Sequence, residues 1–325
     1  MEKHPVELPA LRLALVGFSP AEQAVLEMAL AKIRAGLPWS QSSLADADAM
    51  FACGRRAVSL PGGLVQINPG LAGALPVLLD IHDSNRPLAF SLPLDAPGLL
   101  TANSFDVLKP ESIRAMLVQF TGWLRPMAVK FWLASRIVQE RLDLSSTVYH
   151  VSIEGRLQAV VSRRNGVGVL PIADPAQMAE AVWARRPGLA DEIPGHFVRT
   201  ALTEVLWRYA MRTTRDLLPT YFRSGPVYWC RAPQLPQGLF RDSHLMIVRE
   251  LAHAPATFAE LGRRTGLAEA VLARDLAALR ITGAVTHDRK QALKATGQLP
   301  DKSPRGVLPD KTAPAPLTPL TLQGA

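Results

Sequence analysis

Short apolar runs alternate with helix-like segments over residues 1–125. The run from Leu11 to Gly17 predicts a buried strand. Residues 20–34 carry Ala, Leu and Met at helical spacing behind Ser19, which predicts a capped helix. Further apolar runs predict strands at residues 49–53, 76–79, 88–92 and 105–108, and Pro110 opens a helix that runs to about residue 124. Strands interleaved with helices predict an α/β domain with a doubly wound parallel sheet.

Residues 126–145 predict a linker helix. Phe131, Trp132, Ile137 and Val138 form an apolar stripe along it, beside charged residues. Such a helix either joins the flanking domains or pairs between subunits.

The middle of the chain, residues 146–241, predicts a small α+β domain. Residues 147–172 alternate apolar and polar positions and contain Glu154-Gly155 and Asn165-Gly166, a pattern typical of two or three strands joined by tight turns. Asp174 predicts the cap of a helix over residues 175–184, and apolar periodicity predicts a long helix over residues 196–218. The aromatic segment 221–231 predicts a strand.

Residues 242–288 show the periodicity of three helices followed by a strand. Leu245, Ile247, Val248 and Leu251 recur at helical spacing, a second short helix is expected over 257–264, and Gly266 precedes a third that ends at Gly283. The segment TFAELGRRTGL is similar to the first helix and turn of the winged helix-turn-helix of bacterial regulators. AEAVLARDLAALRITGAVT is similar to the recognition helix and wing of that family.

The winged-helix resemblance implies contact with DNA. Five arginines could approach the phosphate backbone from this region: Arg263, Arg264, Arg274, Arg280 and Arg289. The third helix opens with Ala268, Glu269 and Ala270, so its only early polar side chain is acidic. We therefore expect attraction to the backbone in preference to reading of bases.

A second resemblance lies in SFDVLKPESIRAML, residues 104–117, which is similar to the last strand and last helix of a response-regulator receiver domain. In that family the lysine pairs with an aspartyl phosphate, which places this role on Lys109. The family also needs acidic residues after the first strand and an Asp at the end of the third. This chain has Gly17, Phe18 and Ser19 at the first place and Arg55 and Arg56 after the other strand. The resemblance therefore implies a pseudo-receiver without phosphotransfer, used for docking or for a homodimer.

Composition adds a preference for anionic partners. The chain has 325 residues and a formal net charge of +8, and its isoelectric point is near 9.9. The two cysteines, Cys53 and Cys230, lie far apart in apolar surroundings and predict buried thiols. The first residues lack the pattern of a secretory signal, and no apolar run reaches the roughly 18 residues of a membrane span. We therefore expect a cytoplasmic protein. No motif for a metal, a cofactor or a catalytic site is present, so we expect no enzyme.

Two arginine groups offer a candidate nucleotide site. Arg163 and Arg164 precede the Asn165-Gly166 turn, and Arg208 and Arg212 share one face of the expected helix. The alternative interpretations are a solvated hairpin turn for the first group and a solvated helix face for the second.

The sequence therefore predicts a receiver-like domain over 1–125, the linker helix over 126–145, the α+β domain over 146–241, the winged helix over 242–288 and a disordered basic, Pro-rich tail over 289–325. One hypothesis is a phosphorylation-independent transcriptional regulator that contacts DNA. The other is a signalling adaptor that binds a protein or a cyclic nucleotide and uses the winged helix for protein contacts.

Overall fold

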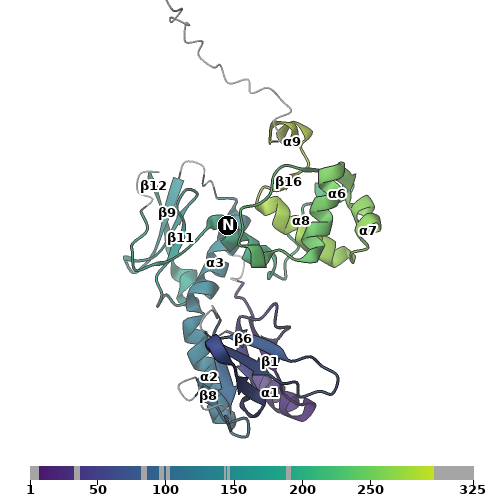
Figure 1. Cartoon of the computed structure of the whole chain (residues 1–325). Helices are drawn as coiled ribbons and strands as arrows, with labels where there is room; N and C mark the ends of the chain where they lie inside the picture. Colours follow the sequence, from purple (N-terminus) through teal and green to yellow (C-terminus); the bar gives the residue numbers. More distant parts are fainter. Residues whose placement is uncertain are drawn as a thin grey trace, which may run out of the picture.

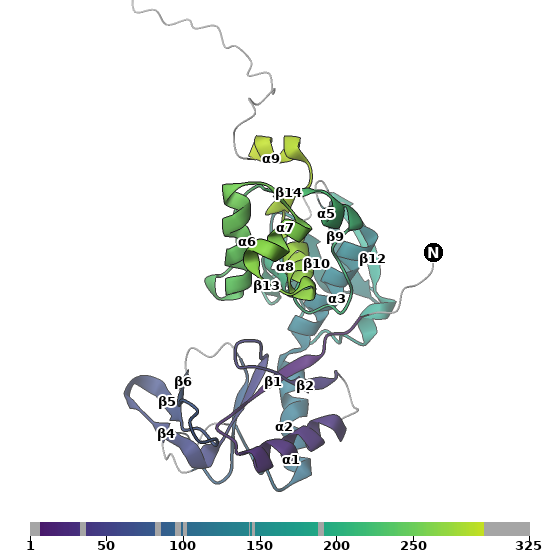
Figure 2. The same cartoon turned by 90° about the vertical axis from the view of Figure 1, so that its right-hand side faces the viewer.

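A computed structural model describes residues 7–32, 37–81, 86–94, 99, 103–142, 144, 147–187 and 192–295. The described residues pack into an N-terminal unit, a middle unit and a C-terminal unit (Figures 1 and 2). Helix α3 (Arg125–Glu140) joins the first unit to the second, and helix α4 (Leu202–Ala210) joins the second unit to the third.

The N-terminal unit is built on a five-stranded parallel sheet. In the sheet the strands lie in the order β2, β1, β3, β7, β8, with bounds β1 (Leu11–Val16), β2 (Trp39–Gln41), β3 (Ala49–Ala52), β7 (Leu88–Ser91) and β8 (Ser104–Phe105). This is one of the two common strand orders of doubly wound sheets. The strands expected near residues 11, 49, 88 and 105 are confirmed.

The two faces of this sheet are covered differently. Helices α1 (Pro20–Lys32) and α2 (Pro110–Trp123) pack on one face, around Phe51, Phe105 and Phe120. The other face carries a three-stranded antiparallel sheet made of β4 (Ala57–Ser59), β5 (Leu64–Ile67) and β6 (Val77–Asp80). The strand expected over 76–79 thus exists as β6, but it belongs to this second sheet. A sheet replaces helices on that face in the described residues, so the doubly wound description is wrong there.

Helix α3 (Arg125–Glu140) begins directly after α2 and leads into the middle unit (Figure 1). Its residues Phe131, Trp132 and Ile137 are buried against a five-stranded antiparallel sheet. That sheet has the order β12, β9, β10, β11, β13, with bounds β9 (Thr147–Ile153), β10 (Arg156–Ser162), β11 (Gly166–Val169), β12 (Val182–Pro187) and β13 (Val198–Thr200). The expected turn at Glu154-Gly155 is confirmed, and both of its residues have positive φ.

Three expectations for the middle of the chain were wrong. Asp174 accepts a hydrogen bond from the Ala176 amide, but only a short 3-10 turn follows, and the segment then becomes edge strand β12. Residues 196–218 do not form one helix, because Val198–Thr200 pairs with β11 before α4 (Leu202–Ala210) begins. The segment 221–231 starts as helix α5 (Thr220–Ser224), and only then becomes β14 (Pro226–Trp229).

The C-terminal unit has the predicted three helices and a small sheet. The helices are α6 (Asp242–His253), α7 (Phe258–Thr265) and α8 (Glu269–Ile281). Thr257 and Glu260 cap α7 reciprocally, and Gly266 ends it with a φ of 68°. Strand β14 lies between β15 (Ala256–Thr257) and β16 (Val285–Thr286), so the unit begins before residue 242.

The predicted tail does not start at residue 289. Arg289–Ala295 forms helix α9, which lies next to β16, and Ala292 is buried. The rest of the predicted tail, 296–325, lies outside the described residues.

Helix α4 is shared between two cores. Val205 and Tyr209 pack into the middle unit, whereas Trp207 and Ala210 pack into the C-terminal unit. Helix α4 also lies against α8, whose residues Leu272, Ala273 and Asp275 to Leu279 are buried. The equivalent of the recognition helix is therefore largely enclosed.

Candidate anion-binding pocket

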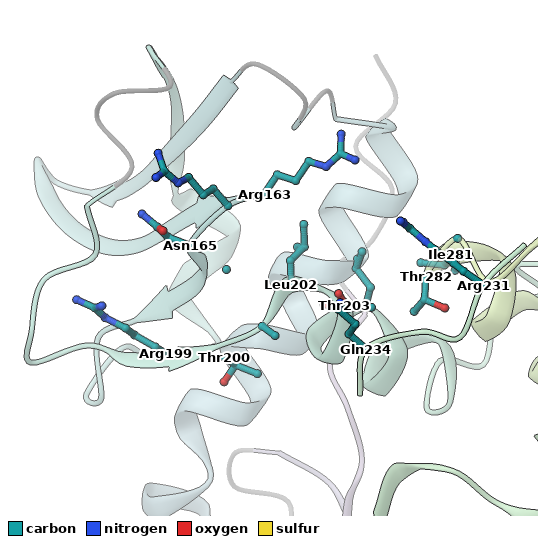
Figure 3. A pocket seen from close by; sticks show the side chains of 15 residues that line it. Arg163, Asn165, Arg199, Thr200, Leu202, Thr203, Arg231, Gln234, Ile281 and Thr282 are labelled. Carbon is teal, nitrogen blue, oxygen red and sulfur yellow. The ribbon is translucent and has the colours of Figure 1, made fainter. Parts of the chain in front are cut away.

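A pocket of about 660 Å³ lies between the middle and C-terminal units (Figure 3). Four arginines line it, and they come from segments far apart in the sequence: Arg163, Arg164, Arg199 and Arg231. Threonines, Gln234, Asn165 and a few aliphatic side chains complete the lining. We call this cavity the arginine pocket.

One wall of the arginine pocket is the turn between β10 and β11. The Ser162 hydroxyl accepts hydrogen bonds of 3.2 Å from the amides of Arg164 and Asn165, which fixes the turn. Gly166 follows with a φ of 84°, and a Cβ there would lie 2.4 Å from the carbonyl oxygen of Thr200. Only glycine permits this close approach of β11 to β13. The turn therefore presents Arg163 and Arg164 from a rigid base.

Arg199 belongs to the same wall, on strand β13. It pairs with Gly168 of β11, and its guanidinium donates to the carbonyl oxygen of Ile193. Gly168 is needed there because an added Cβ would lie 2.2 Å from the Ile193 side chain. The Ile193 segment thus holds Arg199 beside the β10–β11 turn, and Figure 3 shows Arg163, Asn165 and Arg199 on the same side of the pocket.

The opposite wall comes from the C-terminal unit. Arg231 follows β14, and Cys230 beside it donates from its amide to the carbonyl oxygen of Ala284. The neighbouring turn carries Thr282 and Gly283, which has a φ of 73°. Figure 3 shows the Arg231 side chain extending from this wall toward the side that carries Arg163. Cations thus lie on both sides of the cavity.

Helix α4 supplies the floor through Leu202, Thr203 and Leu206. Thr200, just before the helix, accepts a hydrogen bond of 2.6 Å from Nζ of Lys130 on α3. Burial lowers the pKa of Lys130 to about 8, with Glu204 opposing and Arg208 adding to the shift. A fifth basic group therefore lies directly behind the lining.

The lining is strongly electropositive. In the part of the chain that the structure describes, no Asp or Glu lines the pocket, and Arg163, Arg164, Arg199 and Arg231 have no ion-pair partner. Guanidinium groups that line one cavity without a neighbouring carboxylate repel one another, so an anion bound among them is stabilised. Guanidinium groups also bind phosphate oxygens in two-point contacts.

Among the described residues, the lining offers threonine hydroxyls but no imidazole or thiol. No His or Cys lines it, and Cys230 beside it is buried, which raises the pKa of its thiol despite the charge of Arg231. The thiol thus stays protonated at neutral pH. The described lining is therefore suited to hold an anion.

Of the four predicted nucleotide-binding arginines, two line this pocket and two do not. Arg163 and Arg164 lie in it. Arg208 instead pairs with Glu204 at 2.8 Å, and Arg212 pairs with Asp48 of the N-terminal unit. The two groups are separated because β13 interrupts the expected helix. Arg208 on α4 and Arg212 after it form ion pairs elsewhere.

The predicted DNA-contacting arginines form two groups, three that are exposed and two that are engaged within the protein. Arg263, Arg264 and Arg289 are exposed. Arg274 donates to buried Asp275 at 3.2 Å, and the Arg280 guanidinium lies 5.8 Å from the ring centre of Phe222. Helix α8 packs against α4, and its first-turn residues Glu269 and Ala270 are exposed.

The receiver-like edge of the N-terminal sheet is closed by an arginine. Arg56 donates to the Gly17 carbonyl oxygen at 2.9 Å and pairs with Glu22 at 3.0 Å. In the receiver family this edge of the sheet needs acidic residues. Lys109 is 75% exposed and pairs with Asp106 at 3.2 Å. Cys53 is buried at the end of β3, as expected from its surroundings. This edge thus offers neither a phosphoacceptor carboxylate nor an inward-facing lysine in the described residues.

Within the described residues, no cluster of three or more His, Cys, Asp or Glu side chains could hold a metal ion. In the same part of the chain no helix has the length and apolar character to cross a membrane.

Comparison with known proteins assigns no family to this chain. The sequence matches no protein-family model and no curated protein. The receiver-like and winged-helix similarities therefore stand as resemblances of sequence segments, without support from a related protein.

Sequence reasoning missed Arg231 and Thr200 and misplaced Arg199 in a helix. Arg231 follows an aromatic segment, and its position depends on pairing between β14 and β16. The Asn-Gly turn was the one visible signal of the pocket.

Proposed function

We propose that this chain is a non-enzymatic regulatory protein of the cytoplasm that binds a phosphate-bearing, nucleotide-like ligand in the arginine pocket. Arg163, Arg164 and Arg199 of the middle unit and Arg231 of the C-terminal unit are the ligand-binding cations. The single observation that carries the proposal is that these four arginines line one cavity, in which no carboxylate of the described residues takes part.

The two-sided construction of the pocket supports a regulatory role. A ligand that touches both walls binds more tightly when the two units are held together, so its binding favours that arrangement. The winged-helix-like unit would then be the output, and the receiver-like unit a docking or dimerisation surface. The enclosed α8 favours protein contacts for this output, which was the second of the two sequence hypotheses.

The proposal is tested by calorimetry of the full chain with a panel of mononucleotides and dinucleotides. The double variant Arg163→Ala with Arg164→Ala should weaken binding by at least about tenfold, because two charge-assisted contacts are lost. Arg249→Ala is the matched control, since Arg249 is exposed on α6 outside the pocket. Absence of binding by every member of the panel would contradict the proposal.

DNA contact is the second candidate function. Its specific support is the exposure of Arg263 and Arg264 at the end of α7 and of Arg289 at the start of α9, close to wing strand β16. These arginines suit contacts to phosphates, whereas Arg274 and Arg280 are engaged within the protein.

A salt series with random duplex DNA tests this candidate. Binding should weaken steeply with salt, and Arg263→Ala with Arg264→Ala should reduce both the affinity and the salt slope. Arg114→Ala, an exposed arginine on α2, controls for loss of charge. Binding that ignores the α7 arginines, or no binding at low salt, would remove DNA from consideration.

A further inference from the structure

The placement of cations in the arginine pocket restricts the ligand beyond its being anionic. Arg163 lies on the wall made by the β10–β11 turn, and Arg231 on the wall made by the C-terminal unit (Figure 3). A cavity of about 660 Å³ is far larger than one phosphate group and lies in the usual size range of small-molecule sites. A ligand that satisfies both walls therefore needs anionic groups at two separate places.

The surface between the charged walls suits flat, partly apolar groups. Leu202, Leu206 and Ile281 provide aliphatic surface, and Thr203 and Gln234 provide hydrogen-bonding groups. Guanidinium planes also stack on nucleobases. The lining thus has places for bases as well as for phosphates.

The lining also distinguishes between kinds of phosphate. Nucleoside triphosphates usually bind together with Mg²⁺, whose protein ligands are carboxylate and hydroxyl oxygens. No described residue of the arginine pocket carries a carboxylate. A phosphodiester carries a single charge and needs no metal, so it matches arginines alone.

From these three observations we infer that the ligand of the arginine pocket is a cyclic dinucleotide. Its ring holds two phosphodiesters rigidly on opposite edges, one toward Arg163 and Arg164 and the other toward Arg231, with the bases near α4. Rigidity matters because a ligand already in its bound shape loses less entropy on binding. The inference rests on the proposed function and names the class of ligand for the same site.

The test compares four probes by calorimetry with the full chain: cyclic di-GMP, cyclic di-AMP, linear 5′-phosphorylated di-GMP and 3′,5′-cyclic GMP. At least one cyclic dinucleotide should bind about tenfold or more tightly than the linear and mononucleotide probes. Arg231→Ala and Arg163→Ala should each weaken that binding by about tenfold, because each removes contacts to one phosphate.

Two results would overturn the inference while nucleotide binding in the arginine pocket still stands. In one, the linear probe or cyclic GMP binds as tightly as the cyclic dinucleotides. In the other, Arg231→Ala leaves the affinity for the cyclic dinucleotide unchanged while Arg163→Ala lowers it, which would place the ligand on one wall. If none of the four probes binds, the inference fails, and the proposed function is then decided by the wider panel of mononucleotides and dinucleotides. The Arg249→Ala variant should bind like the wild type in every case.

Discussion

Arg212 on the segment after α4 pairs at two points with Asp48, which lies between β2 and β3 of the N-terminal unit. The Arg212 and Asp48 side chains are only 11% and 7% exposed. Asp48 also accepts a hydrogen bond of 3.0 Å from the Arg12 amide. This pair connects the N-terminal unit to the segment after α4, the helix that the middle and C-terminal units share.

We expect Arg212→Ala to lower the free energy of unfolding by about 3 kcal/mol, because the variant leaves Asp48 buried without its counter-charge. Urea denaturation measures the change. The exposed pair of Arg208 with Glu204 is the control, and Arg208→Ala should cost less than about 0.5 kcal/mol. Equal losses in the two variants would show that burial of the Asp48 pair has no special effect.

The core of the C-terminal unit contains buried Asp275, which should make the unit sensitive to acid. Burial alone would raise the pKa of Asp275, but the polar side chains of His244 and Ser243 and the nearby charge of Arg274 outweigh burial, so the pKa is lowered. A carboxylate with a lowered folded pKa adds stability above its unfolded pKa, and this stability is lost as the pH falls through the folded value.

Relative to Asp275→Asn, the wild type should therefore lose stability as the pH drops below about 4, where unfolded Asp begins to take up protons. Urea midpoints measured between pH 3 and pH 7 would show this. Parallel curves for the wild type and Asp275→Asn across that range would contradict it.

Lys130 behind the arginine pocket should make stability depend on pH in the alkaline range. Burial lowers its pKa from 10.5 to about 8, so the unfolded chain binds more protons than the folded one between these values. Stability then rises with pH across that window. The difference in unfolding free energy between the wild type and Lys130→Met should move in favour of the wild type from pH 8 to pH 10.5. A constant difference would mean that Lys130 titrates alike in both states.

Gly166 and Gly155 offer a matched test of the turn that presents the pocket arginines. Both have positive φ, 84° and 77°, but only at Gly166 would an added Cβ meet backbone, the Thr200 carbonyl oxygen at 2.4 Å. Gly155→Ala should cost about 1 kcal/mol from its conformation. Gly166→Ala should cost roughly 1–3 kcal/mol more from the clash and should also weaken ligand binding. Urea denaturation measures the stability of the two variants, and calorimetry measures their ligand binding. Similar losses of stability in both would disprove the close approach of Gly166 to Thr200.

Some elements of this chain are marked by residues close together in the sequence, whereas others form only through pairing with distant segments. Helix α7 could be predicted because Thr257, Glu260 and Gly266 mark both of its ends within a few residues. Strand β13 could not, since Val198–Thr200 is a strand only through its pairing with β11. Arg163 stood beside a recognisable turn, whereas Arg231 reaches the pocket because β14 pairs with β16. Half of the site was therefore visible in the sequence and half depended on tertiary pairing.

Helix α4 has a further consequence for how such a chain can evolve. Its two faces belong to different cores, through Tyr209 on one side and Trp207 on the other. A gene fusion that cut the chain at residue 241 would leave the C-terminal helices without α4, α5 and the central strand β14. The C-terminal unit is thus not an independent module. Recombination could transfer it intact only together with α4, which the core of the middle unit also requires.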